Sequence, residues 1–175
     1  MLSIPDDDNI IIIGKVSDTS DDFIDTGGIY LLPNGIPRNG TIISVRAFGI
    51  LGADAPPNAI PYLRVLVFRE DDETYNLLYD EEYTHNITSA DKLPLNWDVK
   101  KGDAIGAFIP YNCIDRESES PKCPSQINLC ISLKKCFHLQ YFPVGSDNRE
   151  EFMTIPADQL EEVQVSLNME VETST

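Results

Sequence analysis

Apolar and polar residues alternate over several stretches of this chain. The clearest alternation runs from Glu162 to Val171, where every second residue is apolar. Successive side chains of a strand point to opposite faces, so this pattern predicts a half-buried strand, whereas a helix would scatter the same residues around its circumference. Gln126–Leu133 alternates in the same way, and Phe137–Tyr141 does so after a break at Lys134-Lys135. We predict one strand over each of these three ranges.

Other stretches are more continuously apolar. Tyr62–Phe68 is apolar and β-branched apart from Arg64, which is typical of a strand in the middle of a sheet. The turn Lys100-Lys101-Gly102-Asp103 resembles a hairpin connection into the next strand. Further strands are expected at Ile10–Val16, Ile29–Leu32, Thr41–Ile50, Tyr75–Tyr79 and Ala104–Ile109.

These eight or nine strands are separated by Pro- and Gly-containing turns, and only Ala157–Glu162 suggests a helical turn. Many short strands with such turns predict an all-β fold, which we interpret as a single antiparallel β-sandwich over residues 1–175 with jelly-roll-like topology. An immunoglobulin-like arrangement is the alternative. The cysteine–tryptophan–cysteine order of immunoglobulin domains is absent, because Trp97 precedes all four cysteines.

The charge of the chain narrows the range of partners. Asp and Glu number 29 against 13 Lys and Arg, a net charge of −16. Such a surface repels nucleic-acid phosphates and anionic lipid headgroups, so we expect no nucleic-acid partner. No purely apolar run is longer than the four residues of Ile10–Ile13, far short of the roughly 18 residues of a membrane span, so we expect no insertion of this chain into a membrane.

Four cysteines cluster in the second half of the chain, at Cys113, Cys123, Cys130 and Cys136. We expect two disulfides and favour the pairs Cys113–Cys123 and Cys130–Cys136 among the three possible pairings. The first would close the polar segment Ile114–Lys122, and the second would tie two neighbouring strands. A zinc site that includes His138 and a set of four free thiols are the alternatives, but no Cys-x-x-Cys pair supports zinc.

Two glycosylation sequons accompany the cysteines. Asn39-Gly40-Thr41 and Asn86-Ile87-Thr88 both lie in turn-like sequence, so Asn39 and Asn86 are the candidate acceptors. Disulfides and glycans together indicate an extracellular or cell-surface location. The first residues lack the basic and apolar regions of a signal peptide, so we expect a fragment of a larger extracellular protein.

Closely spaced acidic residues suggest a metal site. Asp18, Asp21, Asp22 and Asp25 place carboxylates at short spacing, and Ca²⁺ takes six to eight oxygen ligands. Calcium is therefore the candidate cofactor. The segment does not follow the EF-hand pattern, because Phe23 stands where that loop needs glycine. The alternative is a solvated acidic loop.

The chain carries none of the familiar catalytic motifs. Its sequence contains no Gly-x-Ser-x-Gly elbow, no His-Glu-x-x-His pair and no phosphate-binding glycine loop, so we expect a non-enzymatic protein. A glycosidase pair among the many carboxylates is the enzymatic alternative. Candidate binding residues are Trp97, which could stack on a sugar or belong to the core, and Pro57 and Asn58 in the Gly52–Pro61 loop.

Parts of the chain resemble a known kind of module. Leu95–Pro110, with its Val-Lys-Lys-Gly-Asp-Ala-Ile-Gly turn, resembles the strand–turn–strand of many extracellular jelly-roll modules. Gly28–Gly35, Asn39–Gly49 and Cys123–Leu129 resemble uncharacterised jelly-roll-like modules in ectodomains of cell-surface proteins of simple animals such as sponges. The resemblance implies a fold and a place outside the cell, and it brings no functional residue.

These observations favour an extracellular recognition or adhesion module that binds a protein or glycan through its loops. Binding residues concentrate on loops that a rigid scaffold presents, so the Gly52–Pro61 and Ile114–Lys122 segments are the expected surfaces. The alternatives are a carbohydrate-binding module of an enzyme and a self-assembling structural jelly-roll subunit, which would be a homo-oligomer.

Overall fold

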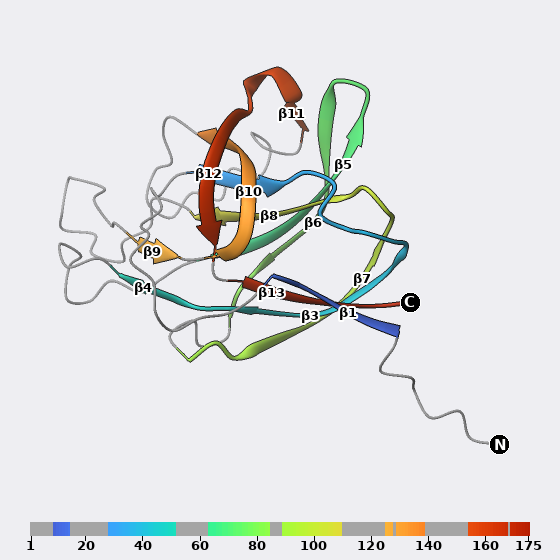
Figure 1. Cartoon of the computed structure of the whole chain (residues 1–175), viewed down its shortest axis with the longest axis vertical. Coiled ribbons are helices and arrows are strands. Elements are labelled where there is room, and N and C mark those ends of the chain that lie inside the picture. The colour runs from blue at the N-terminus through green and yellow to red at the C-terminus, as the bar shows by residue number, and fades with distance from the viewer. Residues whose placement is uncertain are drawn as a thin grey trace.

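The computed structural model shows two antiparallel sheets that face each other as a β-sandwich (Figure 1). The structure describes residues 9–14, 28–51, 63–84, 89–109, 125–127, 129–138, 154–167 and 169–175. At 49–51, 109, 125–127, 129–138 and 162–167 the description covers the backbone alone. The predicted all-β sandwich is confirmed, whereas the strand order does not establish the jelly-roll connectivity.

The smaller of the two facing sheets has four strands. Their order is β1 (Ile10–Gly14), β13 (Met169–Ser174), β3 (Gly40–Ala47) and β7 (Lys92–Val99). Among the described strands, β7 lies at the edge of this sheet. It can therefore contain Pro94, which has no N–H to donate and would remove a hydrogen bond from the ladder of a central strand.

The larger sheet has seven strands and contains the middle of the fold. Their order is β11 (Thr154–Pro156), β6 (Thr74–Glu82), β5 (Arg64–Asp71), β8 (Ala104–Ile109), β2 (Gly28–Leu32), β10 (Leu129–His138) and β12 (Glu161–Leu167). A separate pair joins β4 (Gly49–Leu51) to β9 (Ser125–Ile127).

The main hydrophobic core lies between the two sheets. The four-stranded sheet contributes side chains such as Val45, Trp97 and Val171, and the larger sheet contributes side chains such as Val67 and Ile105. Alternation along each strand places these residues on the facing surfaces, so burial of apolar area holds the layers together.

A second core covers the opposite face of the larger sheet. Leu31, Leu66, Phe68, Phe108 and Ile155 are all fully buried there. Strands β2, β5 and β8 therefore have both faces buried, which is why their sequences are nearly continuous apolar runs rather than alternating ones.

The seven-stranded sheet must curl strongly, because its two edge strands are consecutive along the chain. Only the 3-10 turn Ala157–Gln159 and Leu160 separate β11 from β12. A flat sheet would hold these edges about 29 Å apart, at about 4.8 Å per strand. The connection can span only about 17 Å. The curl brings the edges together, so the second core lies on its concave side.

Close packing in this core explains one glycine. A Cβ at Gly106 would lie 2.5 Å from Leu31 Cδ2 and 2.8 Å from the Tyr30 carbonyl oxygen. Both neighbours belong to β2, the strand hydrogen-bonded to β8. Any larger residue would therefore push two central strands apart.

The structure corrects several boundaries predicted from the pattern. The alternating C-terminal run is two strands rather than one: β12 belongs to the larger sheet and β13 to the smaller sheet. Conversely, β10 continues through Lys134-Lys135, where the sequence suggested a break. The interruption is present only as an irregularity in the pairing with β12 between Leu133 and Lys135. Alternation reports which residues share a face, but it carries no information about which sheet a strand joins.

Two further corrections concern the region after Asp91. The hydrophobic pattern alone gave no strand over Lys92–Val99, where the structure has β7, although the resemblance of Leu95–Pro110 to a strand–turn–strand implies one. Leu93, Trp97 and Val99 alternate along β7 and are buried. The Lys100–Asp103 turn is also not a hairpin, because β7 and β8 lie in different sheets. The turn instead carries the chain from one layer of the sandwich to the other. The expected helical turn is present as the short 3-10 turn Ala157–Gln159.

Candidate functional site

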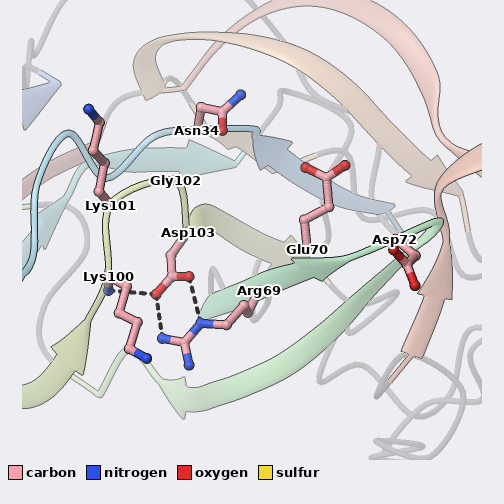
Figure 2. Close-up of a pocket in the computed structure, with 8 residues that line it drawn as sticks. All are labelled: Asn34, Arg69, Glu70, Asp72, Lys100, Lys101, Gly102 and Asp103. Carbon is pink, nitrogen blue, oxygen red and sulfur yellow. Dashed lines mark hydrogen bonds and ion pairs between the residues drawn. The ribbon is translucent and has the colours of Figure 1, made fainter.

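Three turns meet at one end of the sandwich and surround an open depression of about 440 Å³ (Figure 2). Pro33–Gly35 leads out of β2, Asp72-Glu73 joins β5 to β6, and Lys100–Asp103 joins β7 to β8. The side chains that give the depression its polar character are Asn34, Arg69, Glu70, Asp72, Lys100 and Lys101.

Backbone hydrogen bonds fix two of these turns against each other. The Ile36 amide donates to the Asp103 carbonyl at 3.0 Å, and the Gly102 amide donates to the Ile36 carbonyl at 2.9 Å. The Asp103 amide closes its own turn on the Lys100 carbonyl at 3.0 Å. Gly102 has a φ of +94°, a conformation that glycine adopts without strain, so the sequence supplies the residue that this turn requires.

Asp103 anchors the floor of the depression. Its side chain is only 3% exposed, and its carboxylate accepts hydrogen bonds from Arg69 Nε and Nη2, both at 2.9 Å. The same carboxylate accepts the Lys100 amide at 2.8 Å. A buried carboxylate is stable only when it is paired and hydrogen-bonded, and here three donors satisfy it.

Arg69 neutralises this buried charge. Hydrogen bonding to Asp103 raises the pKa of the guanidinium above its ordinary value, against the smaller opposing effect of burial. The Arg69 side chain is 38% exposed, so the pair joins the buried anchor to the surface of the depression. With their charges cancelled, neither residue contributes net charge to a ligand.

The remaining charges of the depression are exposed and uncompensated. Lys100 and Lys101 form no ion pair with another described residue, and the same holds for Glu70 and Asp72. Figure 2 shows the two lysines on one side of the depression and the two carboxylates on the other, with Arg69 between them. The depression therefore presents separated positive and negative poles to solvent.

This arrangement can hold a charged or hydrogen-bonding ligand. Among the described residues, its lining provides ammonium groups, a guanidinium, carboxylates and one side-chain amide, and no aromatic ring. A neutral sugar usually rests one face on an aromatic ring, so this depression favours ionic over stacking recognition.

Of the two roles predicted for Trp97, sugar stacking or the hydrophobic core, the structure shows the second. It is 8% exposed and belongs to the main core between the sheets. Its ring stacks on Tyr79, with centroids 5.0 Å apart and planes 7° from parallel. Both faces of the indole are therefore unavailable as a platform for a sugar, and we correct the expectation that it binds ligand.

Asn39 lies beside the candidate site. It is exposed in the turn before β3, and its Oδ1 accepts a hydrogen bond from the Lys101 amide at 2.9 Å. Its Nδ2, the atom to which a glycan would attach, makes no hydrogen bond to the described residues. A glycan on Asn39 would stand next to the Lys100–Asp103 turn, and glycosylation there stays a prediction.

The backbone of β10 corrects the favoured disulfide pairing. Cys130 and Cys136 lie on this one continuous strand, opposite Leu167 and Glu161 of β12. Six residues of regular strand span about 20 Å, whereas a disulfide requires Cα atoms less than about 7 Å apart. β10 has register irregularities beside Cys130 and between Leu133 and Lys135, but its two cysteines still pair with opposite ends of β12. A Cys130–Cys136 bridge is incompatible with this strand, so each cysteine would need another partner.

Several other predicted site residues lie outside the described residues. These are Cys113, Cys123, Asn86, Pro57, Asn58, Asp18, Asp21, Asp22 and Asp25, together with the segments 52–61 and 114–122. In the part of the chain that the structure does describe, no three His, Cys, Asp or Glu side chains gather as a metal site. Within those same residues, no helix has the length and apolar character needed to cross a bilayer.

Sequence reasoning noticed Gly102 and Asp103 but missed their partner, Arg69. Little in the sequence singles out Arg69, because an arginine at the end of an apolar strand normally just extends its charged group into solvent. Only the fold reveals that β5 and the β7–β8 turn meet.

Comparison with protein-family models, curated proteins and solved structures finds no match to this chain.

Proposed function

We propose that this chain is a non-enzymatic extracellular recognition module that binds a partner at the turn-bearing end of its sandwich. The observation that carries the proposal is the depression with uncompensated charges, held by turns that are hydrogen-bonded to one another. A binding surface of this kind loses little conformational entropy when a partner docks, because its backbone is already fixed.

The sequence supports the location. Four clustered cysteines and two sequons suit an oxidising, glycosylating compartment, and Asn39 is exposed as an acceptor must be. The strongly acidic composition disfavours nucleic acid and anionic membranes as partners. We therefore propose a cell-surface or secreted protein with a role in recognition or adhesion.

A self-assembling subunit is the second candidate function. β1 is an edge strand, and Ile10 and Ile12 on it are exposed large apolar residues. An unpaired edge with apolar side chains can add a strand from a second copy. The net charge of −16 opposes such association, so recognition of another molecule is favoured.

Binding arrays test the recognition proposal. A fluorescent tetramer of the domain would be applied to arrays of secreted and cell-surface proteins and to a glycan array. We expect binding to protein targets that is lost in the Lys100→Gln/Lys101→Gln variant and retained in Lys92→Gln. Lys92 is a matched control because it lies on β7 and pairs with Glu172 of β13.

The alternatives give different results in the same experiments. Binding to glycans alone would favour a carbohydrate-binding module, and binding to neither array would contradict the proposal. Light scattering that shows mass increasing with concentration, reversed by Ile12→Thr, would favour self-assembly.

A further inference from the structure

The charge pattern of the depression limits the ligands that it can hold. Lys100 and Lys101 disfavour cations, and Glu70 and Asp72 disfavour phosphate and sulfate, which would bring two or more negative charges beside two carboxylates. None of the described residues that line the depression supplies the aromatic ring on which neutral sugars usually stack. Each simple class of ligand therefore meets at least one unfavourable feature.

A ligand that carries both signs of charge meets no such conflict. We propose that the depression binds a segment of a partner protein in which a cationic side chain and a carboxylate lie a few residues apart. This inference rests on the proposed recognition function and names the chemistry of its partner. The carboxylate would lie toward Lys100 and Lys101, and the cation toward Glu70 and Asp72.

The Arg69–Asp103 pair makes this separation of charge possible. If Asp103 were not neutralised, its carboxylate would attract the neighbouring lysine side chains toward the floor. Because Arg69 takes that role through two hydrogen bonds, the ammonium groups remain available to a ligand. Asp103 is therefore a positioning residue, and Arg69, which also lines the depression, positions the ammonium groups by neutralising it.

The size and charge of the site agree with a short peptide. A volume of about 440 Å³ lies in the range of small-ligand sites and is open to solvent on one side, so a segment can enter without being threaded. The net charge of −16 attracts a segment that is positive overall, while the two lysines select one carboxylate within it.

Nuclear magnetic resonance titration of the ¹⁵N-labelled domain tests the proposal with four acetylated and amidated peptides. They are Lys-Gly-Gly-Glu, its single-charge forms Lys-Gly-Gly-Gln and Gln-Gly-Gly-Glu, and the neutral Gln-Gly-Gly-Gln. We expect the first to shift the amides of residues 69–72 and 100–103 in a saturable manner. Exposed ion pairs are weak, so each missing charge should reduce the affinity about two- to fivefold.

Matched variants test which side chains bind the carboxylate and which bind the cation of the peptide. Lys100→Gln/Lys101→Gln should remove the preference for the peptide carboxylate, and Glu70→Gln/Asp72→Asn should remove the preference for its cation. Lys92→Gln and Glu81→Gln should leave all four titrations unchanged. All these residues are exposed, so none of the substitutions should disturb the core. The amide spectrum of each variant will verify that it is folded.

Two outcomes would overturn the inference: no saturable shift with the doubly charged peptide, or stronger binding of glucuronate or inorganic phosphate at the same amides. Failure here is distinguishable from failure of the recognition proposal. If protein targets on the array still require Lys100 and Lys101 while the peptides do not bind, recognition stands and this choice of ligand is wrong.

Discussion

At the scale of single residues, the structure assigns buried polar groups to specific partners. Tyr83 is the clearest example, because its hydroxyl accepts the Ala47 amide at 3.1 Å and donates to the Asp91 carbonyl. Burial raises the pKa of the Tyr83 phenol, so it remains a neutral donor in the physiological range. One hydroxyl thus ties the end of β3 to the segment that enters β7.

We predict that Tyr83→Phe lowers the free energy of unfolding by about 1–3 kcal/mol, because it leaves an amide and a carbonyl without their partner. Urea denaturation of the domain measures the change. Tyr79→Phe is the matched control: it keeps the stacking on Trp97 and should change stability by less than about 0.5 kcal/mol. Equal effects in the two variants would contradict the assignment.

A second residue prediction concerns the floor of the depression. Asp103→Asn keeps the side-chain volume but removes the charge that Arg69 neutralises, so we expect a loss of about 2 kcal/mol in unfolding free energy. This expected loss of stability is smaller than the loss for a fully buried ion pair, because Arg69 is partly exposed. The exposed Asp98→Asn should stay within about 0.5 kcal/mol. A double-mutant cycle with Arg69→Met should show non-additivity, and strict additivity would refute the coupling.

At the scale of elements, one ion pair connects strands that are not neighbours. Lys92 on edge strand β7 reaches Glu172 on β13 at 2.7 Å, across the intervening strand β3. The hydrogen bond from Lys92 lowers the pKa of the Glu172 carboxyl below its ordinary value of 4.5, although partial burial opposes the change. The folded state therefore favours the ionised carboxylate.

A lowered carboxyl pKa gives stability that is present at neutral pH and lost as the pH falls below 4.5 toward the folded-state value. Lys92→Met should therefore cost at most about 1 kcal/mol at pH 7, because Lys92 is nearly half exposed. The difference from the unmodified domain should vanish in acid. Lys100→Met, which removes an unpaired lysine, should show no such pH dependence, and a constant Lys92 effect down to pH 3 would disprove the linkage.

The continuity of β10 yields a prediction about oxidation. If both disulfides form, Cys130 and Cys136 must each join Cys113 or Cys123, because one extended strand holds them too far apart to join each other. Cleavage after Arg116, Leu129 and Lys134 separates all four cysteines, so non-reducing peptide mapping can read the pairs. Detection of a Cys130–Cys136 bridge would show that β10 is not continuous in the oxidised protein.

At the scale of the whole molecule, the proposal depends on the compartment. We predict that the domain secreted from a eukaryotic host carries glycan, that Asn39→Gln removes part of it, and that reduction adds a pair of hydrogens for each disulfide. Intact mass spectrometry before and after reduction and glycosidase treatment measures all three. Four free thiols without glycan would contradict an extracellular location. Calcium binding stays a prediction, tested by calorimetric titration of the chelator-treated domain.

The sequence by itself determined the class of fold and most of its strands. Period-2 alternation and continuous apolar runs follow directly from one or two buried faces, so residues such as Leu66 and Val171 were recognisable as core. The turn at Gly102-Asp103 could also be predicted, because it needs only local features: a residue that adopts positive φ and a carboxylate that accepts a nearby backbone amide.

Tertiary structure alone decided how these pieces meet. Alternation cannot say that β12 and β13 belong to different sheets, or that Trp97 turns inward onto Tyr79 rather than outward to a ligand. Nor could it place Arg69 against Asp103, 34 residues away, or give the charged Arg64 inside a central strand its partner, Asp80, at 2.6 Å. Contacts between distant residues depend on the packing of the whole chain, whereas periodicity reports only which side of each strand is buried.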